Sequence, residues 1–223
     1  RQVADERTGV IPVAGIPLGP IELMAPLGSG GMSDVWRGVH RAQGVPVAVK
    51  VLSANLARTP LFEAVFRREL EAIASLDHPS IVMVLDYGVV SAATAKASDE
   101  TLVEGSPYLV LELATGGTLR HALRRRPPSW EECRALLLTL LEALAHAHAH
   151  GIVHRDLKPG NILWFDEPEG GGWKLTDFGV AHATSELLVD EREQSAGTPA
   201  YMSPEQIRGH WRDMGPWTDM YGL

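Results

Sequence analysis

The chain has 223 residues, and its 45% hydrophobic content is enough for one or two globular domains with buried cores. Its formal net charge of -8 argues against a nucleic-acid-binding protein, because such proteins depend on a basic surface. The single cysteine, Cys133, excludes an internal disulfide framework and is expected to be a small buried residue of a helix. No apolar stretch is long enough to span a bilayer, so no membrane segment is expected within the chain.

A glycine-rich stretch follows the first predicted strand. Residues 1–20 contain three prolines and predict a flexible lead-in, and a strand pattern begins at Ile21. The stretch LGSGGMSDV, residues 27–35, then offers backbone N–H groups to which a phosphate can come close. A dinucleotide-binding turn does not fit, because a strand pattern follows rather than a helix, and a P-loop does not fit, because Gly-Lys-Ser/Thr is absent. A plain hairpin turn remains the alternative.

A lysine and a glutamate form the next predicted feature. The strand predicted over 45–52 contains VAVK, and its Lys50 needs a partner if it is buried. A helix predicted from Thr59 to about Leu76 carries Glu69 within its apolar stripe, whereas Glu71 points to solvent. The sequence therefore predicts a Lys50–Glu69 ion pair, with a lysine extending to solvent at a strand edge as the alternative.

Two further strands are predicted, over 81–90 and Tyr108–Leu113. The segment between them, Ser91–Gly105, has no periodicity and is predicted to be an exposed inserted loop, with a short helix at Ala92–Ala97 as the alternative. The second of these strands runs into Ala114 and a pair of glycines.

A long helix is predicted in the second half of the chain. Ser129 and Glu132 form a capping box at its start, and Gly151 is a typical residue just after its end. The preceding arginine run, 124–126, is interpreted as a solvated loop rather than an anionic docking site. His146, His148 and His150 suggest a metal site, but no third ligand is evident nearby on the shared face of His146 and His150, so helix-end histidines are the preferred interpretation.

The stretch HRDLKPGNIL, residues 154–163, carries the chemistry. Phosphoryl transfer needs a carboxylate near the attacking hydroxyl and oxygen ligands for magnesium. Asp156 is the candidate base and Asn161 a candidate metal ligand, while Lys158 places a cation beside the moving phosphate. Downstream, Asp177 of the sequence DFG supplies a second carboxylate for magnesium. Between the two motifs, a hairpin is predicted from Trp164 to Trp173.

These motifs, in this order, resemble those of the protein kinase family, and specifically the bacterial-type serine/threonine kinases. The resemblance implies an α+β, two-lobed fold with a small β-rich N-lobe over 21–113 and a mainly helical C-lobe over 114–223 that is truncated at the start of the F-helix. Both ends of the chain therefore look cut, and a membrane anchor beyond Leu223 stays open. A cytoplasmic location is expected.

The resemblance also implies a role for each motif, with ATP and Mg²⁺ as cofactors. Lys50, Glu69, Asp156, Lys158, Asn161 and Thr198 are expected to be catalytic, and Asn161 and Asp177 to bind the metal. Leu111 corresponds to the gatekeeper, and Asp219 is expected to accept backbone N–H groups of the catalytic loop. The expected nucleotide-binding residues are Leu27, Gly28, Ser29, Gly30, Gly31, Met32, Ser33, Val35, Ala48, Lys50, Leu111, Glu112, Ala114 and Leu163.

The segment from Asp177 to Glu205 resembles the family's activation segment. Its candidate phosphorylation sites are Thr184, Ser185 and Ser195, which are expected to face Arg155, and self-association for autophosphorylation is expected. The sequence thus predicts an ATP-dependent kinase acting on serine and threonine hydroxyls of proteins. The alternatives are an inactive nucleotide-binding regulator, suggested by the truncation, and a small-molecule phosphotransferase, which would not need the run 197–205.

Overall fold

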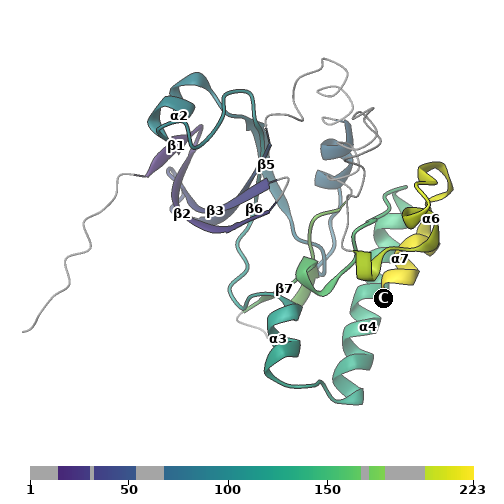
Figure 1. Cartoon of the computed structure of the whole chain (residues 1–223). Helices are drawn as coiled ribbons and strands as arrows, with labels where there is room; N and C mark the ends of the chain where they lie inside the picture. The colour runs from purple at the N-terminus through teal and green to yellow at the C-terminus, as the bar shows by residue number, and fades with distance from the viewer. Residues whose placement is uncertain (1–14, 31–32, 54–67, 167–170, 179–198) are drawn as a thin grey trace, which may run out of the picture.

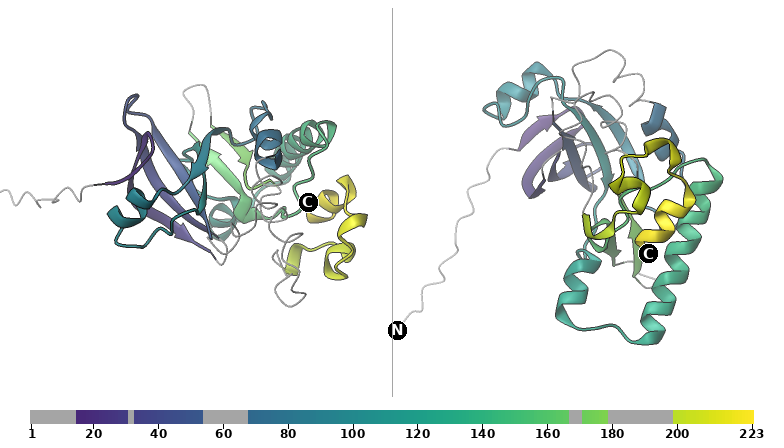
Figure 2. Two further views of the ribbon diagram at one scale, coloured as in Figure 1. Left: turned by 90° about the horizontal axis from the view of Figure 1, so that it is seen from above. Right: turned by 45° about the vertical axis from the view of Figure 1, so that its right-hand side comes forward.

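The computed structural model describes residues 15–30, 33–53, 68–166, 171–178 and 199–223. They form two lobes, a curled antiparallel sheet and a mainly helical part that begins after the last strand of that sheet (Figure 1). The two-lobed fold expected from the sequence is therefore confirmed, and Figure 2 shows the same separation from two further directions.

The sheet of the first lobe has the strand order β1-β2-β3-β4-β6-β5. Its strands are β1 (Ile16–Leu18), β2 (Ile21–Ser29), β3 (Ser33–His40), β4 (Pro46–Leu52), β5 (Val84–Val89) and β6 (Pro107–Glu112). Alternating apolar residues of these strands form one core, which includes Ile21, Val49 and Val110. Strand β1 pairs with β2 and lies within the segment that the sequence analysis had assigned to the lead-in.

The insertion between β5 and β6 is mostly exposed, as predicted, but it contains a helix, so the prediction of a loop was wrong and the alternative was right. Helix α2 (Ala92–Ala97) is capped by Ser91, and the buried Thr94 donates a hydrogen bond from Oγ1 to the carbonyl of Pro17 at 2.8 Å. Leu102 belongs to the core of the sheet. The apolar periodicity is weak because few residues of the insertion reach that core, and the Thr94 hydrogen bond ties α2 to β1.

The second lobe contains α3 (Leu119–Arg125), α4 (Trp130–Ala149), α6 (Pro204–Ile207) and α7 (Pro216–Gly222). Residues 68–74, which precede β5 in the chain, are also helical. Both halves of the predicted capping box form at Ser129, and Gly151 follows α4 with φ +74°, as expected. The buried stripe of α4 begins only at Leu140, so Cys133 near the start of the helix is exposed and its predicted burial was wrong.

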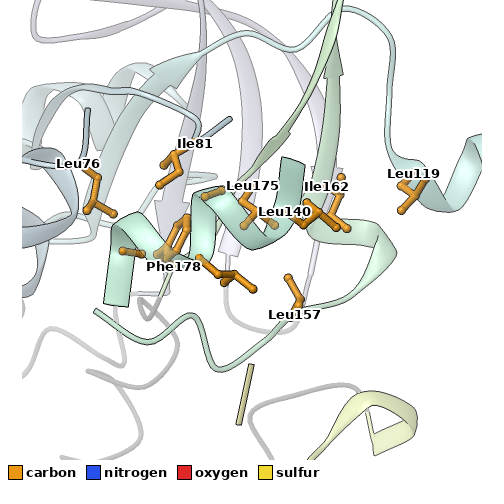
Figure 3. Close-up of a cluster of buried hydrophobic side chains, with 11 residues drawn as sticks. Leu76, Ile81, Leu119, Leu140, Leu157, Ile162, Leu175 and Phe178 are labelled. Atoms are coloured by element: carbon orange, nitrogen blue, oxygen red, sulfur yellow. The ribbon is translucent and has the colours of Figure 1, made fainter. Parts of the chain in front are cut away.

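A short hairpin of β7 (Ile162–Phe165) and β8 (Gly172–Leu175) packs against α3 and α4 in the second lobe. Leu175 is fully buried, and its backbone exchanges hydrogen bonds with Ser80 and Val82, which lie between helix 68–74 and β5. Leu175 and Phe178 pack with Leu140, Leu144 and other apolar side chains in the main core of this lobe (Figure 3). This core fixes the segment that leads to Asp177.

Candidate active site

The catalytic-loop residues predicted from the sequence meet at one carboxylate. Lys158 Nζ lies 2.5 Å from Asp156 Oδ2, and Asn161 Nδ2 donates to the same oxygen at 3.0 Å and to the Asp156 carbonyl at 2.8 Å. A short 3₁₀ turn, η2 (Pro159–Asn161), brings Asn161 back toward Asp156. Because the amide nitrogen of Asn161 is used by Asp156, its Oδ1 is the atom that can bind a cation.

The second carboxylate is paired with the lysine of β4. Lys50 Nζ lies 2.8 Å from Asp177 Oδ1. Burial alone would raise the pKa of the Asp177 carboxyl, but the nearby Lys50 charge and its hydrogen bond outweigh this, so the pKa lies below its usual value. Asp177 adopts φ +66°, a left-handed conformation that is uncommon for a residue with a side chain. The site thus holds two lysine–carboxylate pairs.

A third aspartate holds the backbone of the catalytic loop, residues 154–161. Asp219, which is 1% exposed, accepts hydrogen bonds from the backbone N–H groups of His154 at 2.8 Å and Arg155 at 2.7 Å, as the sequence predicted. His148 Nε2 lies 2.7 Å from the same carboxylate. Gln206 Nε2 donates to the Arg155 carbonyl at 2.6 Å, so two side chains hold Arg155 at φ +65°.

His154 is buried and neutral. Burial lowers its pKa, and its Nε2 donates a hydrogen bond to the Thr176 carbonyl at 2.9 Å. Its Nδ1 accepts from the Asp156 backbone N–H at 3.3 Å, which fixes the Nε2–H tautomer. The ring packs on Phe178 with 4.7 Å between centroids, so the loop 154–161 and the DFG sequence touch through this pair.

Strand register places several predicted nucleotide-binding residues on one face of the sheet. Val35 lies opposite Lys50, and Ala48 lies opposite Leu111. Residues opposite each other share a face, as do residues two apart in a strand, so all four side chains lie on the same side. Gly28 pairs with Val35, and the Gly30 N–H donates to the Ser33 carbonyl at 2.9 Å, which places the described part of the glycine-rich stretch beside them.

The segment after β6 runs along β7. Leu163 pairs with Thr118, and the Trp164 N–H donates to the Gly117 carbonyl at 2.9 Å. Glu112 and Ala114, at the end of β6 and just beyond it, are therefore near the hairpin that carries Leu163. Leu27 and Ser29 lie in β2, in the N-terminal part of the glycine-rich stretch.

Three predicted site residues, Gly31, Met32 and Thr198, lie outside the described residues, as do the candidate phosphorylation sites Thr184, Ser185 and Ser195 and the predicted start of the helix at Thr59. Glu69 lines a cavity together with His150 and Arg155. The Lys50–Glu69 ion pair stays a prediction.

Two residues of this region have roles that the sequence did not predict. Lys174 pairs with Glu112 at 3.0 Å, and the clue was a lysine inside the apolar run WKL, the same argument that had been used for Lys50. Gln206 was missed although Ser203 and Gln206 form a recognisable capping box.

Metal-ligand clusters of three or more His, Cys, Asp or Glu are absent from the described part of the chain. Among the same residues, no helix has the length and apolarity to cross a membrane.

Comparison with known proteins agrees with this geometry. The chain is 37% identical over 198 residues to "Probable serine/threonine-protein kinase PknB" of Bifidobacterium longum, covering 87% of this chain and 27% of the relative. It is 38% identical over 217 residues to "Serine/threonine-protein kinase PknA" of Mycobacterium tuberculosis, covering 95% of this chain and 47% of that protein. The chain thus spans less than half the length of these relatives.

Among solved structures, the kinase domain of Mycobacterium tuberculosis PknI matches with a TM-score of 0.67 and 26% identity, over 94% of this chain and 73% of that one. The family model described as "Protein kinase domain" matches residues 21–223. Because this match covers most of the sequence, and the relatives are bacterial serine/threonine kinases, the chain belongs to the protein kinase family.

Proposed function

We propose that this chain transfers the γ-phosphoryl group of ATP to serine and threonine hydroxyls of proteins. The observation that supports this most is the meeting of Asp156, Lys158 and Asn161 on one loop that is joined to Asp177 through the His154–Phe178 contact. Such an arrangement works by positioning and by charge neutralisation, since phosphoryl transfer leaves little covalent chemistry to the protein.

Asp156 is proposed to orient the acceptor hydroxyl and to accept its proton. Its carboxylate already accepts hydrogen bonds from two side chains, so it is held in one orientation. Lys158, beside it, would neutralise charge on the phosphoryl group as it moves. Lys50 would contact the α- and β-phosphates, and its ion pair with Asp177 supports a position beside this proposed metal ligand.

The oxygen donors fit magnesium. Asn161 Oδ1 and the Asp177 carboxylate are hard ligands of the kind that Mg²⁺ prefers, and the lowered pKa of Asp177 keeps it ionised. When bound, the ion supplies neutralisation of the developing charge on the phosphates. Glu69 is proposed to pair with Lys50, and Thr198 to support the acceptor site.

The nucleotide is proposed to lie between the sheet and the hairpin. Val35 and Ala48 would cover one side of adenine and Leu163 the other, with Leu111 limiting the back and the backbone of Glu112 and Ala114 bonding the base. The glycine-rich stretch 27–33 would cover the phosphates. We also propose lobes over 21–113 and 114–223, a cytoplasmic location, and self-association for autophosphorylation of residues between Asp177 and Glu205.

The test compares three purified variants. Lys50→Met and Asp156→Asn are expected to abolish transfer of radiolabelled phosphate to a protein acceptor while thermal unfolding stays cooperative. Lys96→Met is the control, because Lys96 is exposed on α2. Full activity in a folded Lys50→Met or Asp156→Asn protein would reject the assignment, and labelling of small molecules but no protein would favour a small-molecule phosphotransferase.

A further inference from the structure

A partly buried ion pair joins the two lobes and is not used in the proposed chemistry. Lys174 Nζ lies 3.2 Å from Glu112 Oε1 and 3.0 Å from Oε2. The two side chains are only 12% and 24% exposed. Glu112 ends β6 of the sheet lobe, whereas Lys174 belongs to β8 of the hairpin, so the pair connects elements 62 residues apart.

Further contacts fix both side chains. Glu112 Oε1 also accepts a hydrogen bond from the Met83 backbone N–H at 2.9 Å, and the Glu112 N–H donates to the Met83 carbonyl at 3.2 Å. Lys174 Nζ lies 4.5 Å from the centroid of the Phe165 ring, within the range of a cation–π contact. The carboxylate and the ammonium are therefore held from both sides, and neither group turns without losing a second contact.

The pair connects the two sides of the proposed adenine site. The backbone of Glu112 belongs to the segment that would bond the edge of the base. Lys174 lies directly opposite Leu163 in the β7–β8 ladder, so these two side chains share a face of the hairpin, and Leu163 would lie under the base. The ion pair thus links the edge-binding segment to the floor of the site, in addition to the backbone hydrogen bonds that Trp164 makes with Gly116 and Gly117.

We infer that Lys174 is a positioning residue: through its ion pair with Glu112 it sets the spacing between the 112–114 backbone and Leu163, and so the affinity for the adenine end of ATP. The inference rests on the proposed function only in that the chain binds ATP. Lys174 does not touch the transferred phosphate in this scheme, so the rate at saturating ATP depends little on it.

A purely structural role predicts something different. If the pair only holds the lobes together, breaking it lowers the melting temperature and weakens every ligand of the cleft alike. If the pair sets the spacing between the 112–114 backbone and Leu163, breaking it weakens the binding of ligands that contain the base. A ligand that contains only phosphates should then bind as before. Adenosine and Mg²⁺–tripolyphosphate are therefore the two probes.

The experiment uses Lys174→Met, Glu112→Gln, the double variant and Lys174→Arg, with binding measured by calorimetry and transfer by steady-state kinetics. We expect both single variants to bind adenosine and ATP about fivefold more weakly or worse, with KM for ATP raised to match and kcat within about twofold. The double variant should bind adenosine and ATP no more weakly than the single variant with the lower affinity, since the two single substitutions break the same interaction. Lys174→Arg should restore binding to within about twofold.

The control is Arg126→Met, which breaks the exposed Arg126–Glu132 pair within the second lobe and should leave adenosine binding unchanged. Unchanged adenosine binding in Lys174→Met would overturn the inference, as would an equal loss of adenosine and tripolyphosphate binding. A parent protein that binds ATP but phosphorylates no protein would reject the proposed function instead, while the binding measurements would still decide the role of Lys174.

Discussion

Among the residues that hold the catalytic loop, Asp219 should be the one whose replacement has the largest effect. Its two carboxylate oxygens receive three hydrogen bonds: Oδ2 from His154 N and His148 Nε2, and Oδ1 from Arg155 N. In Asp219→Asn one oxygen becomes an NH₂ group, which cannot accept. Either the Arg155 N–H or the pair of donors at Oδ2 then loses its acceptor.

The cost follows from these contacts. A buried donor left without an acceptor costs about 1–3 kcal/mol, and the remaining hydrogen bonds lose the strength that the negative charge gives them. Arg155, held at φ +65° partly by this carboxylate, adds backbone strain that is no longer opposed. We therefore expect Asp219→Asn to lower the free energy of unfolding by about 2–4 kcal/mol, which corresponds to a drop of about 5–15 °C in melting temperature.

Urea denaturation and calorimetry measure this loss directly. Asp213→Asn is the matched control, because the same chemical change is made at an exposed carboxylate, and it should alter the free energy of unfolding by less than about 0.5 kcal/mol. The reasoning is refuted if Asp219→Asn also changes the free energy of unfolding by less than about 0.5 kcal/mol. Phosphotransfer should fall as well, since Arg155 immediately precedes Asp156.

Three further outcomes are expected. In Gly38→Ala the new Cβ would lie 2.8 Å from Ile21 Cγ2 inside the sheet core, so the free energy of unfolding should fall by about 1–3 kcal/mol in urea titrations. Ser129→Ala removes the cap of α4 and should cost about 1 kcal/mol, whereas Ser129→Asp, which can still cap, should cost less. The lowered pKa of His154 means that the unfolded chain binds its proton more readily, so its contribution to stability is complete above about pH 6.5 and is lost as the pH falls below that value. Melting temperatures between pH 7.5 and 5 should therefore fall less in His154→Phe than in the parent, and parallel curves would contradict this.

The residues that carry the chemistry could be identified from local sequence patterns. The loop from His154 to Asn161 and the aspartate at 177 are local patterns, and the chemistry of carboxylate, amide and lysine groups limits what they can do. The long helix could be predicted equally well, because the capping box at Ser129 and the glycine after α4 are local features that do not depend on the remainder of the fold.

Which side chains come into contact depends on the tertiary structure. A periodic pattern can show that Lys50 needs a partner, but it does not measure the distance to Asp177, which lies more than a hundred residues away. The choice of helix over loop at α2, the exposure of Cys133 and the Glu112–Lys174 pair could not be predicted for the same reason. Each depends on contacts between segments distant in the chain, and local propensity contains no information on how far those segments lie from one another in space.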